Sequence, residues 1–276
     1  MITLLFIGDI VGRPGRQILK RALAPLVERH GVDLVIANVE NAAAGFGVTP
    51  EIADELLDAG VQVMTGGNHT WDKKEIVPYF EHQPRLLRPA NMPAGTPGRG
   101  SYVARTAAGV GVGVVNAMGR VFMTAIDDPF RVVLTEIDVV RRDASVVFVD
   151  FHAEATSEKV AMGWHLDGRA TAVVGTHTHV QTADERVLPR GTAYITDVGM
   201  TGPHDSVIGV ERGAILARFM TGLPQRFETA TENPRINGVL ITADERTGRA
   251  TTITRLNLSA DDVDALVAAP SHASHA

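Results

Sequence analysis

The chain has 276 residues, of which 45% are hydrophobic and 21% charged, a composition typical of globular proteins. It lacks cysteine, which excludes disulfides, zinc ribbons, iron–sulfur clusters and thiol nucleophiles. The net charge of −6 argues against stable binding of long nucleic acids, because proteins that neutralise many phosphates usually carry a basic surplus. No apolar run approaches the ~20 residues of a membrane span, so we expect a cytoplasmic protein without membrane attachment.

Predicted strands and helices alternate along the chain. The strands are short, apolar and rich in β-branched residues, and Thr49 followed by Pro50 marks one helix start. In chain order we expect strands at Ile2–Ile7, Leu34–Asn38, Val61–Thr65, Ser101–Thr106, Val110–Asn116, Ser145–Phe151, Ala172–Gly175, Thr192–Asp197, Gly238–Ala243 and Ala250–Leu256. Between them we expect helices at Pro14–Arg29, from Thr49 to near Gly60, and at Lys73–Phe80, Phe130–Arg142 and Ser157–His165. Several prolines predict that residues 83–99 form a surface connection.

This alternation predicts an α/β fold with helices on both faces of a sheet. Because some strand pairs are closely spaced and therefore antiparallel, we expect a two-sheet β-sandwich flanked by helices. No linker divides the chain, so residues 1–266 are expected to form one domain. Residues 117–129 are a candidate cap segment over the site, and residues 267–276 read as a disordered, low-complexity tail.

Polar residues of metal-ligand type follow five of the predicted strands. In open α/β sheets, ligands bind beyond the carboxyl ends of the strands, so these residues are expected to meet at one edge. They are Asp9, Glu40, Asn41, Asn68, His69, His152, His177 and His179. Taken singly, each also fits an ordinary turn residue or a hydrogen-bonded histidine. His177 and His179 are stronger, since extended residues two apart point to the same side. Their joint occurrence at five strand ends favours a metal site.

Five sequence blocks resemble those of the calcineurin-like metallophosphoesterases, and more narrowly the YmdB-type bacterial branch. The blocks are GDIVGRPGR, NVENAAAGFGVTP, GGNHTWD, DFHAEATSEK and GTHTHVQTADERVLP. The resemblance implies the four-layered metallophosphoesterase fold (α/β/β/α) and phosphodiesterase activity. The sequence departs from the wider superfamily at Val11, where a histidine ligand is usual, and at Glu40, which replaces a bridging aspartate.

The resemblance also implies a ligand set for two transition-metal ions per chain. One ion would take Asp9, Glu40, Asn41 and His179, and the other Glu40, Asn68, His152 and His177. Glu40 would bridge the two ions, and Asn41 would fill the position left by Val11. The family favours iron or manganese, while the mixed ligand types leave zinc open.

A mechanism follows from two ions ~3.5–4 Å apart, which lower the pKa of a shared water and clamp the phosphoryl oxygens. A bridging hydroxide would then attack the phosphorus of a small phosphodiester. His69, beside the ligand Asn68, would be the general acid that protonates the leaving oxygen. The alternative role for His69 is to orient Asn68 or a carboxylate.

The family resemblance points to 2′,3′-cyclic nucleotides as substrates. A phosphomonoesterase or a nuclease is an enzymatic alternative, although the acidic charge counts against the nuclease. A different alternative is a regulatory metal- or nucleotide-binding module in RNA turnover with slow or incidental hydrolysis. The sequence leaves a homo-oligomer open.

Overall fold

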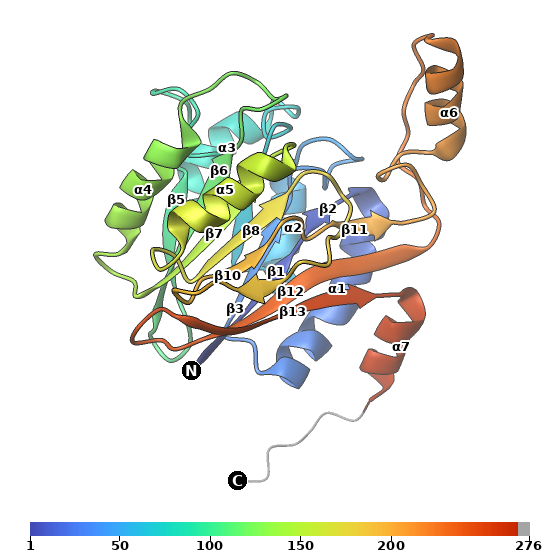
Figure 1. Ribbon diagram of the computed structural model, residues 1–276. Coiled ribbons are helices and arrows are strands. Elements are labelled where there is room, and N and C mark those ends of the chain that lie inside the picture. The colour runs from blue at the N-terminus through green and yellow to red at the C-terminus, as the bar shows by residue number, and fades with distance from the viewer. Residues whose placement is uncertain (270–276) are drawn as a thin grey trace.

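Two β-sheets stacked face to face form the centre of the protein, and helices cover both outer faces (Figure 1). This computed structural model describes residues 1–269. The first sheet has the order β2-β11-β12-β1-β3-β4, with β13 paired to β12, and its strands are β1 (Ile2–Ile7), β2 (Asp9–Ile10), β3 (Leu34–Asn38), β4 (Val63–Thr65), β11 (Met200–Pro203), β12 (Pro234–Ala243) and β13 (Ala250–Leu258). The second sheet has the order β5-β6-β7-β8-β10-β9, and its strands are β5 (Ser101–Arg105), β6 (Gly111–Met118), β7 (Val146–His152), β8 (Ala172–Thr176), β9 (Arg186–Val187) and β10 (Ala193–Ile195). The predicted two-sheet sandwich flanked by helices is therefore confirmed.

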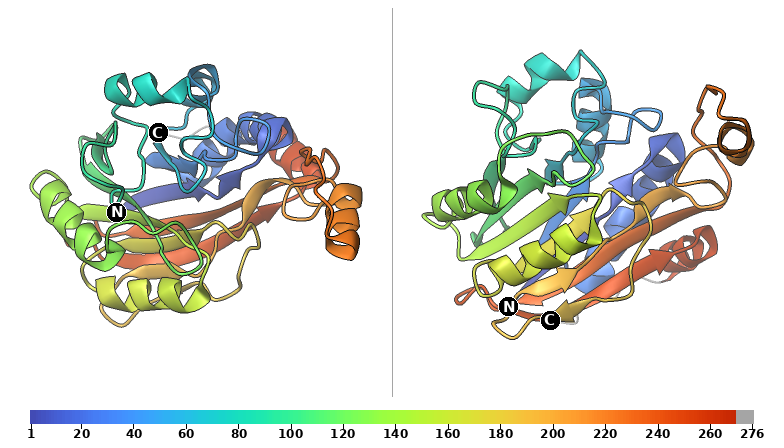
Figure 2. Two further views of the ribbon diagram at one scale, coloured as in Figure 1. Left: turned by 90° about the horizontal axis from the view of Figure 1, so that it is seen from above. Right: turned by 45° about the horizontal axis from the view of Figure 1, so that its top comes forward.

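Three apolar layers hold the sandwich together. Between the sheets, Phe6 and Phe148 pack with ring centroids 5.1 Å apart. The outer layers lie between each sheet and its helices. The helices are α1 (Gly12–His30), α2 (Pro50–Asp58), α3 (Ile76–His82), α4 (Pro129–Val140), α5 (Thr156–Leu166), α6 (Arg212–Thr221) and α7 (Ala260–Ala268). Helices α1, α2, α3 and α7 pack on the first sheet, α4 and α5 pack on the second, and α6 projects from the body (Figure 2).

Parallel strands bring the predicted polar residues to one place. In the first sheet β1, β3 and β4 are parallel, and in the second sheet β6, β7, β8 and β10 are parallel. Contacts between residues that follow β4 and residues at the end of β7 place the carboxyl ends of both sets at the same edge of the sandwich. The site is thus built by two sheets together.

Several segments differ from the sequence-based predictions. The short strands β2, β9 and β11 and the helices α6 and α7 were not predicted, because each is brief or lacks a strong apolar period. Leu86 and Leu87, in the predicted surface connection, are buried, since this segment forms bridges with Met64 and Arg99. Among residues 1–269, no helix is long and apolar enough to cross a membrane.

The structure describes the predicted cap segment and the first residues of the predicted tail. Ala117 and Met118 belong to β6, and the backbone N–H groups of Arg120 and Val121 donate to Glu158 on α5. The segment 117–129 is therefore tied to α5. Helix α7 continues to Ala268, two residues into the predicted tail, and residues 270–276 of that tail lie outside the described residues.

Candidate metal centre

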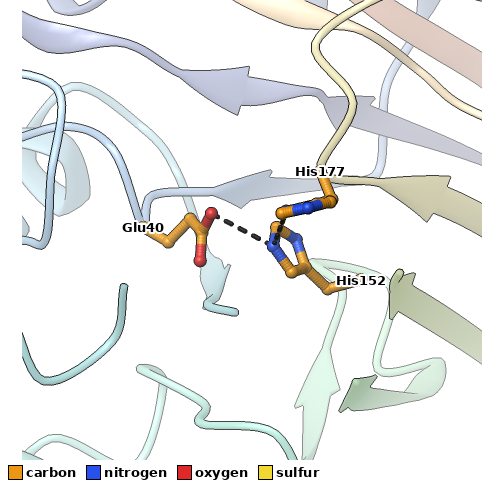
Figure 3. A group of neighbouring side chains, drawn as sticks. All are labelled: Glu40, His152 and His177. Atoms are coloured by element: carbon orange, nitrogen blue, oxygen red, sulfur yellow. Dashed lines mark hydrogen bonds and ion pairs between the residues drawn. The ribbon is translucent and has the colours of Figure 1, made fainter. Parts of the chain in front are cut away.

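Glu40, His152 and His177 converge where the two sheets meet (Figure 3). One ligand-type atom from each of them lies within 4.8 Å of the others. The Nε2 atom of His152 lies 3.1 Å from Glu40 Oε1 and 3.0 Å from His177 Nδ1. It also lies 2.9 Å from Asn68 Oδ1. These four side chains are the group predicted to hold one ion, and they come from elements far apart in the sequence.

The second predicted group contains buried oxygen atoms that lack a partner. Within the described part of the chain, Asp9 Oδ1, Glu40 Oε1 and Asn41 Oδ1 are buried and accept no hydrogen bond. The amide nitrogen of Asn41 donates to Gly45 O at 3.1 Å, which leaves its oxygen as the free ligand atom. Buried polar atoms are normally paired, because an unpaired one loses its hydration without compensation. A bound cation would supply the missing partner, so these residues fit a metal site.

The tautomer of His152 suits metal binding. Thr176 Oγ1 donates to Asp150 Oδ1 at 2.7 Å, so this hydroxyl accepts the hydrogen of His152 Nδ1, 2.9 Å away. The lone pair of Nε2 then faces the cluster. Burial disfavours the charged ring, yet the adjacent Glu40 carboxylate outweighs it and raises the pKa of His152 to about 9. Bound cations would favour the unprotonated ring instead, since they become the largest local charges.

His177 and His179 each contact a neighbouring group through one ring nitrogen. His177 Nε2 lies 3.0 Å from Glu154 Oε2, and His179 Nδ1 lies 2.8 Å from Ile208 O. In each ring the second nitrogen is therefore left for a ligand bond. Asp9 Oδ2 accepts a hydrogen bond from His177 N at 3.2 Å, which links Asp9 to this loop.

The sequence reasoning assumed that the segment with His177 and His179 is extended. The structure shows that it is not. His177 has φ 102° and His179 has φ 66°, both in the left-handed region. Non-glycine residues in such conformations cost on the order of 1–3 kcal/mol each and occur where the surroundings hold them firmly. The two rings therefore reach the site through a strained backbone.

Asp150 joins the two sheets beneath the site. It is fully buried and accepts from Asn38 Nδ2 at 3.1 Å and from Thr65 Oγ1 at 2.5 Å, both on the first sheet. On the second sheet it accepts from Thr176, and burial raises the pKa of Asp150 to about 6. We call Asn38, Thr65, Asp150 and Thr176 the seam network. The sequence analysis missed it, although a carboxylate inside the apolar strand at 146–151 signals a buried partner.

Gly67 is required by the close approach of the backbone to the cluster. A Cβ atom added there would lie 2.3 Å from Glu40 Oε2 and 2.4 Å from His152 Nε2. Any larger residue would therefore displace two of the predicted ligands.

His69 lies at the rim of the cluster and its ring is held from one side. Its Nδ1 lies 2.8 Å from Asp72 Oδ2, and its ring centroid is 4.9 Å from that of Phe46 in an edge-on contact. The backbone N–H of His69 donates to Glu40 Oε2 at 3.1 Å. His69 therefore contacts Glu40 through its backbone and Asp72 through its ring. The sequence analysis did not identify Asp72 as a partner.

A cavity of about 260 Å³ opens above these residues. Its polar floor includes Glu40, Asn41, His69, His177 and His179. Its largely apolar wall is formed by Val11, Phe46, Ile208, Val210 and Phe227. Most of this wall comes from residues 208–210 and 227–229, which flank the projecting α6. The cavity can therefore hold a small molecule that has both a polar and an apolar part.

Comparison with known proteins decides the family. The model of the YmdB-like protein family matches residues 5–256. The chain belongs to the YmdB-like family. It is 50% identical to the 2′,3′-cyclic-nucleotide 2′-phosphodiesterase of Bacillus subtilis (strain 168), covering 94% of this chain and 98% of that protein. The family predicted from the sequence blocks is thus confirmed.

Solved structures of related proteins share the whole fold of this YmdB-like chain. A hypothetical protein from Thermus thermophilus is 43% identical, with a TM-score of 0.87, covering 94% of this chain and 99% of that one. A phosphatase from Mycoplasma pneumoniae is 36% identical, with a TM-score of 0.88, covering 94% and 93%.

In this YmdB-like chain, the contacts and the cavity place every predicted site residue at the same edge of the sandwich. Four of them, including His152, form one cluster, and Asn41, His69 and His179 line the cavity. Asp9 is fully buried and contacts the backbone of His177. The residues that sequence reasoning missed are the partners of the predicted site residues: Asp72, Asp150, Glu154 and Thr176.

Proposed function

We propose that this chain is a phosphodiesterase that works with two bound transition-metal ions and acts on small phosphodiesters, in particular 2′,3′-cyclic nucleotides. The observation that carries the proposal is the set of buried, unpaired oxygen atoms on Asp9, Glu40 and Asn41, together with the convergence of Glu40 with His152 and His177. The name of the Bacillus subtilis relative, half identical over nearly the full length, supports both the reaction and the substrate.

The proposed ligands divide into two groups that share Glu40. Asp9, Asn41 and His179 would hold one ion with Glu40, and Asn68, His152 and His177 would hold the other. When bound, the ions supply Lewis acidity and activate water at neutral pH. Asp9 and Glu40 contribute a charge of −2 against +4 for two divalent ions. The remaining positive charge favours an anionic substrate and its nucleophile. Iron or manganese is proposed on family grounds, with zinc as an alternative.

His69 would donate a proton to the leaving oxygen of the substrate. Asp72 accepts a hydrogen bond from Nδ1 and so fixes the orientation of the ring, which leaves Nε2 as the nitrogen that would donate to the substrate. The ring lies at the cavity rim, within reach of a substrate on the cluster. This arrangement supports general-acid catalysis over the alternative in which His69 only orients Asn68.

The size and lining of the cavity favour a small nucleotide as substrate. Its apolar wall, with Phe46 and Phe227, suits a base or sugar, while the polar floor suits the phosphate. The carboxylates of Glu154 and Glu228 at the same cavity disfavour a long polyanion. We therefore favour a phosphodiesterase over a nuclease, and the name of the Bacillus subtilis relative favours it over a monoesterase.

Metal analysis combined with a substrate panel tests the proposal. Elemental analysis of the purified protein should find about two equivalents of iron or manganese per chain, and chelation should abolish turnover until Mn²⁺ is restored. Bis-p-nitrophenyl phosphate and cyclic nucleotides should be hydrolysed faster than p-nitrophenyl phosphate or short RNA. Full activity after the metals are stripped would reject the mechanism. A cellular effect that survives replacement of both Asn68 and His69 would instead favour the regulatory role.

A further inference from the structure

We infer that Lys159 and Asp197 form a positioning pair that fixes the loop of His177 and His179 and thereby sets the metal affinity of the centre. The inference rests on the proposed function, because it assigns a role to residues behind the proposed ligands. Neither residue was among the site candidates found from the sequence.

The pair is an ion pair in the protein interior. Lys159 on α5 and Asp197 after β10 each have side chains only 1% exposed, and Nζ lies 2.5 Å from Asp197 Oδ2. Charged residues are rarely buried unless they are paired and hydrogen-bonded, and removing one partner leaves a costly lone charge. Such a pair next to the ligand loop calls for an explanation beyond stability.

Asp197 binds the residue that lies between the two histidines. Its Oδ2 accepts from Thr178 N at 3.1 Å and from Thr178 Oγ1 at 2.8 Å. Its Oδ1 accepts from Gly199 N at 2.8 Å. Thr178 is thereby held at two points, which restrains the backbone from which the two flanking histidines project.

This anchor explains how the strained loop is maintained. His177 and His179 both have left-handed backbone conformations, which persist only when neighbouring groups over-determine them. Asp9 accepts the His177 N–H on one side of the loop, and Asp197 holds Thr178 on the other. Because His177 and His179 belong to different ion sites in the proposed ligand set, one anchor controls both.

Lys159 stabilises the buried carboxylate of Asp197 by pairing with it. Its ammonium neutralises a carboxylate that would otherwise add to the negative charge of Asp9 and Glu40 near the same edge. Without Lys159, Asp197 would be a lone buried charge and would either take up a proton or draw in water, and either change weakens its hold on Thr178.

The test uses Mn²⁺ as the probe and the full chain. Isothermal titration calorimetry should show about 10- to 100-fold weaker Mn²⁺ binding in Lys159→Met and in Asp197→Asn, the range found when partners of metal ligands are removed. The electron paramagnetic resonance spectrum of the bound Mn²⁺ pair should also change. Lys20→Met, which removes a half-exposed lysine on α1, is the matched control and should bind like the wild type.

A second pair of variants keeps the test decisive if the buried substitutions prevent folding. Thr178→Val removes only the hydroxyl bond to Asp197 and should weaken Mn²⁺ binding. Thr178→Ser keeps the hydroxyl and should bind Mn²⁺ with wild-type affinity. The inference would be overturned if folded variants showed a lowered melting temperature but unchanged Mn²⁺ affinity and spectrum. The pair would then contribute only to stability. Failure of the wild-type chain to bind Mn²⁺ would instead reject the proposed function.

Discussion

The two sheets contribute different chemistry to the centre. The proposed metal ligands from the first sheet are all oxygen donors: Asp9, Glu40, Asn41 and Asn68. The candidates from the second sheet are all imidazoles: His152, His177 and His179. Neither half alone contains the full proposed ligand set, so the proposed centre forms only when the sheets pack. The seam network lies directly beneath it and joins the two halves.

The two halves also have different electrostatic needs. The oxygen half carries the negative charge and leaves three buried oxygen atoms unpaired, so it needs cations. The imidazole half needs orientation, and each ring has one nitrogen against a separate partner: Thr176, Glu154 or the carbonyl of Ile208. Substitutions in the first half should therefore affect charge and metal occupancy, and those in the second half should affect ligand geometry.

The largest effect is expected from Glu40→Gln, because Glu40 contacts the imidazole half and carries one of the two proposed ligand charges. Turnover of bis-p-nitrophenyl phosphate should fall by at least about 10³-fold, corresponding to several kcal/mol of lost transition-state stabilisation. Elemental analysis should show less than the wild-type metal content. Wild-type metal content and rate in this variant would remove Glu40 from the ligand set.

His69→Gln should separate proton donation from metal binding. Both ions should be retained, while kcat falls by about 10²–10³-fold, within the usual range for loss of a general acid or base. The loss should be smaller for bis-p-nitrophenyl phosphate, whose leaving group needs little protonation, than for a cyclic nucleotide. An unchanged kcat on both substrates would show that His69 has no catalytic role.

Thr176→Val tests the link between the imidazole half and the seam network. The change removes the hydroxyl that joins His152 to Asp150, so Mn²⁺ affinity should fall by about 10- to 100-fold in calorimetry. The same substitution at exposed Thr252 on β13 is the control and should leave the affinity unchanged. Equal affinities in the two variants would argue that His152 needs no such support.

The smallest effect is expected at Asp184, downstream of the histidine loop. Burial opposes its charge, but hydrogen bonds from Thr182 and Thr196 outweigh it and hold the pKa of Asp184 below its ordinary value. Its folded-state pKa is depressed, so the stabilisation is present above the ordinary pKa of 3.8 and lost as pH falls through the depressed value. Urea unfolding of Asp184→Asn should show a deficit of about 1 kcal/mol at pH 7, since the site is partly exposed. A deficit that stays constant down to pH 3 would contradict this origin.

The sequence predicted the ligands better than their supports, for a physical reason. Asp9, Glu40, Asn68 and the histidines directly follow apolar strands, and the ends of parallel strands meet at one edge. Asp150 and Thr65 are on different sheets, and their contact depends on sheet stacking that no local pattern encodes. The same holds for Lys159 and Asp197.

The cavity wall was not predicted because its residues lack a periodic pattern. Residues 208–210 and 227–229 lie in irregular chain on either side of α6, and all of α6 is exposed or half-buried. Among the described residues, these segments and the loop at Phe46 supply most of the apolar wall. The cap role of residues 117–129 stays a prediction.

The position of β12 in the first sheet bears on how the enzyme matures. This late strand lies between β1 and β11, pairing from Ile2 with Ala243 to Ile7 with Gly238, and β11 in turn pairs with Asp9 through Met200. The first sheet around Asp9 is therefore complete only once β12 has been synthesised. A protein shortened before β12 would contain every proposed ligand but would lack the strand that joins β1 to β11 and so completes this sheet.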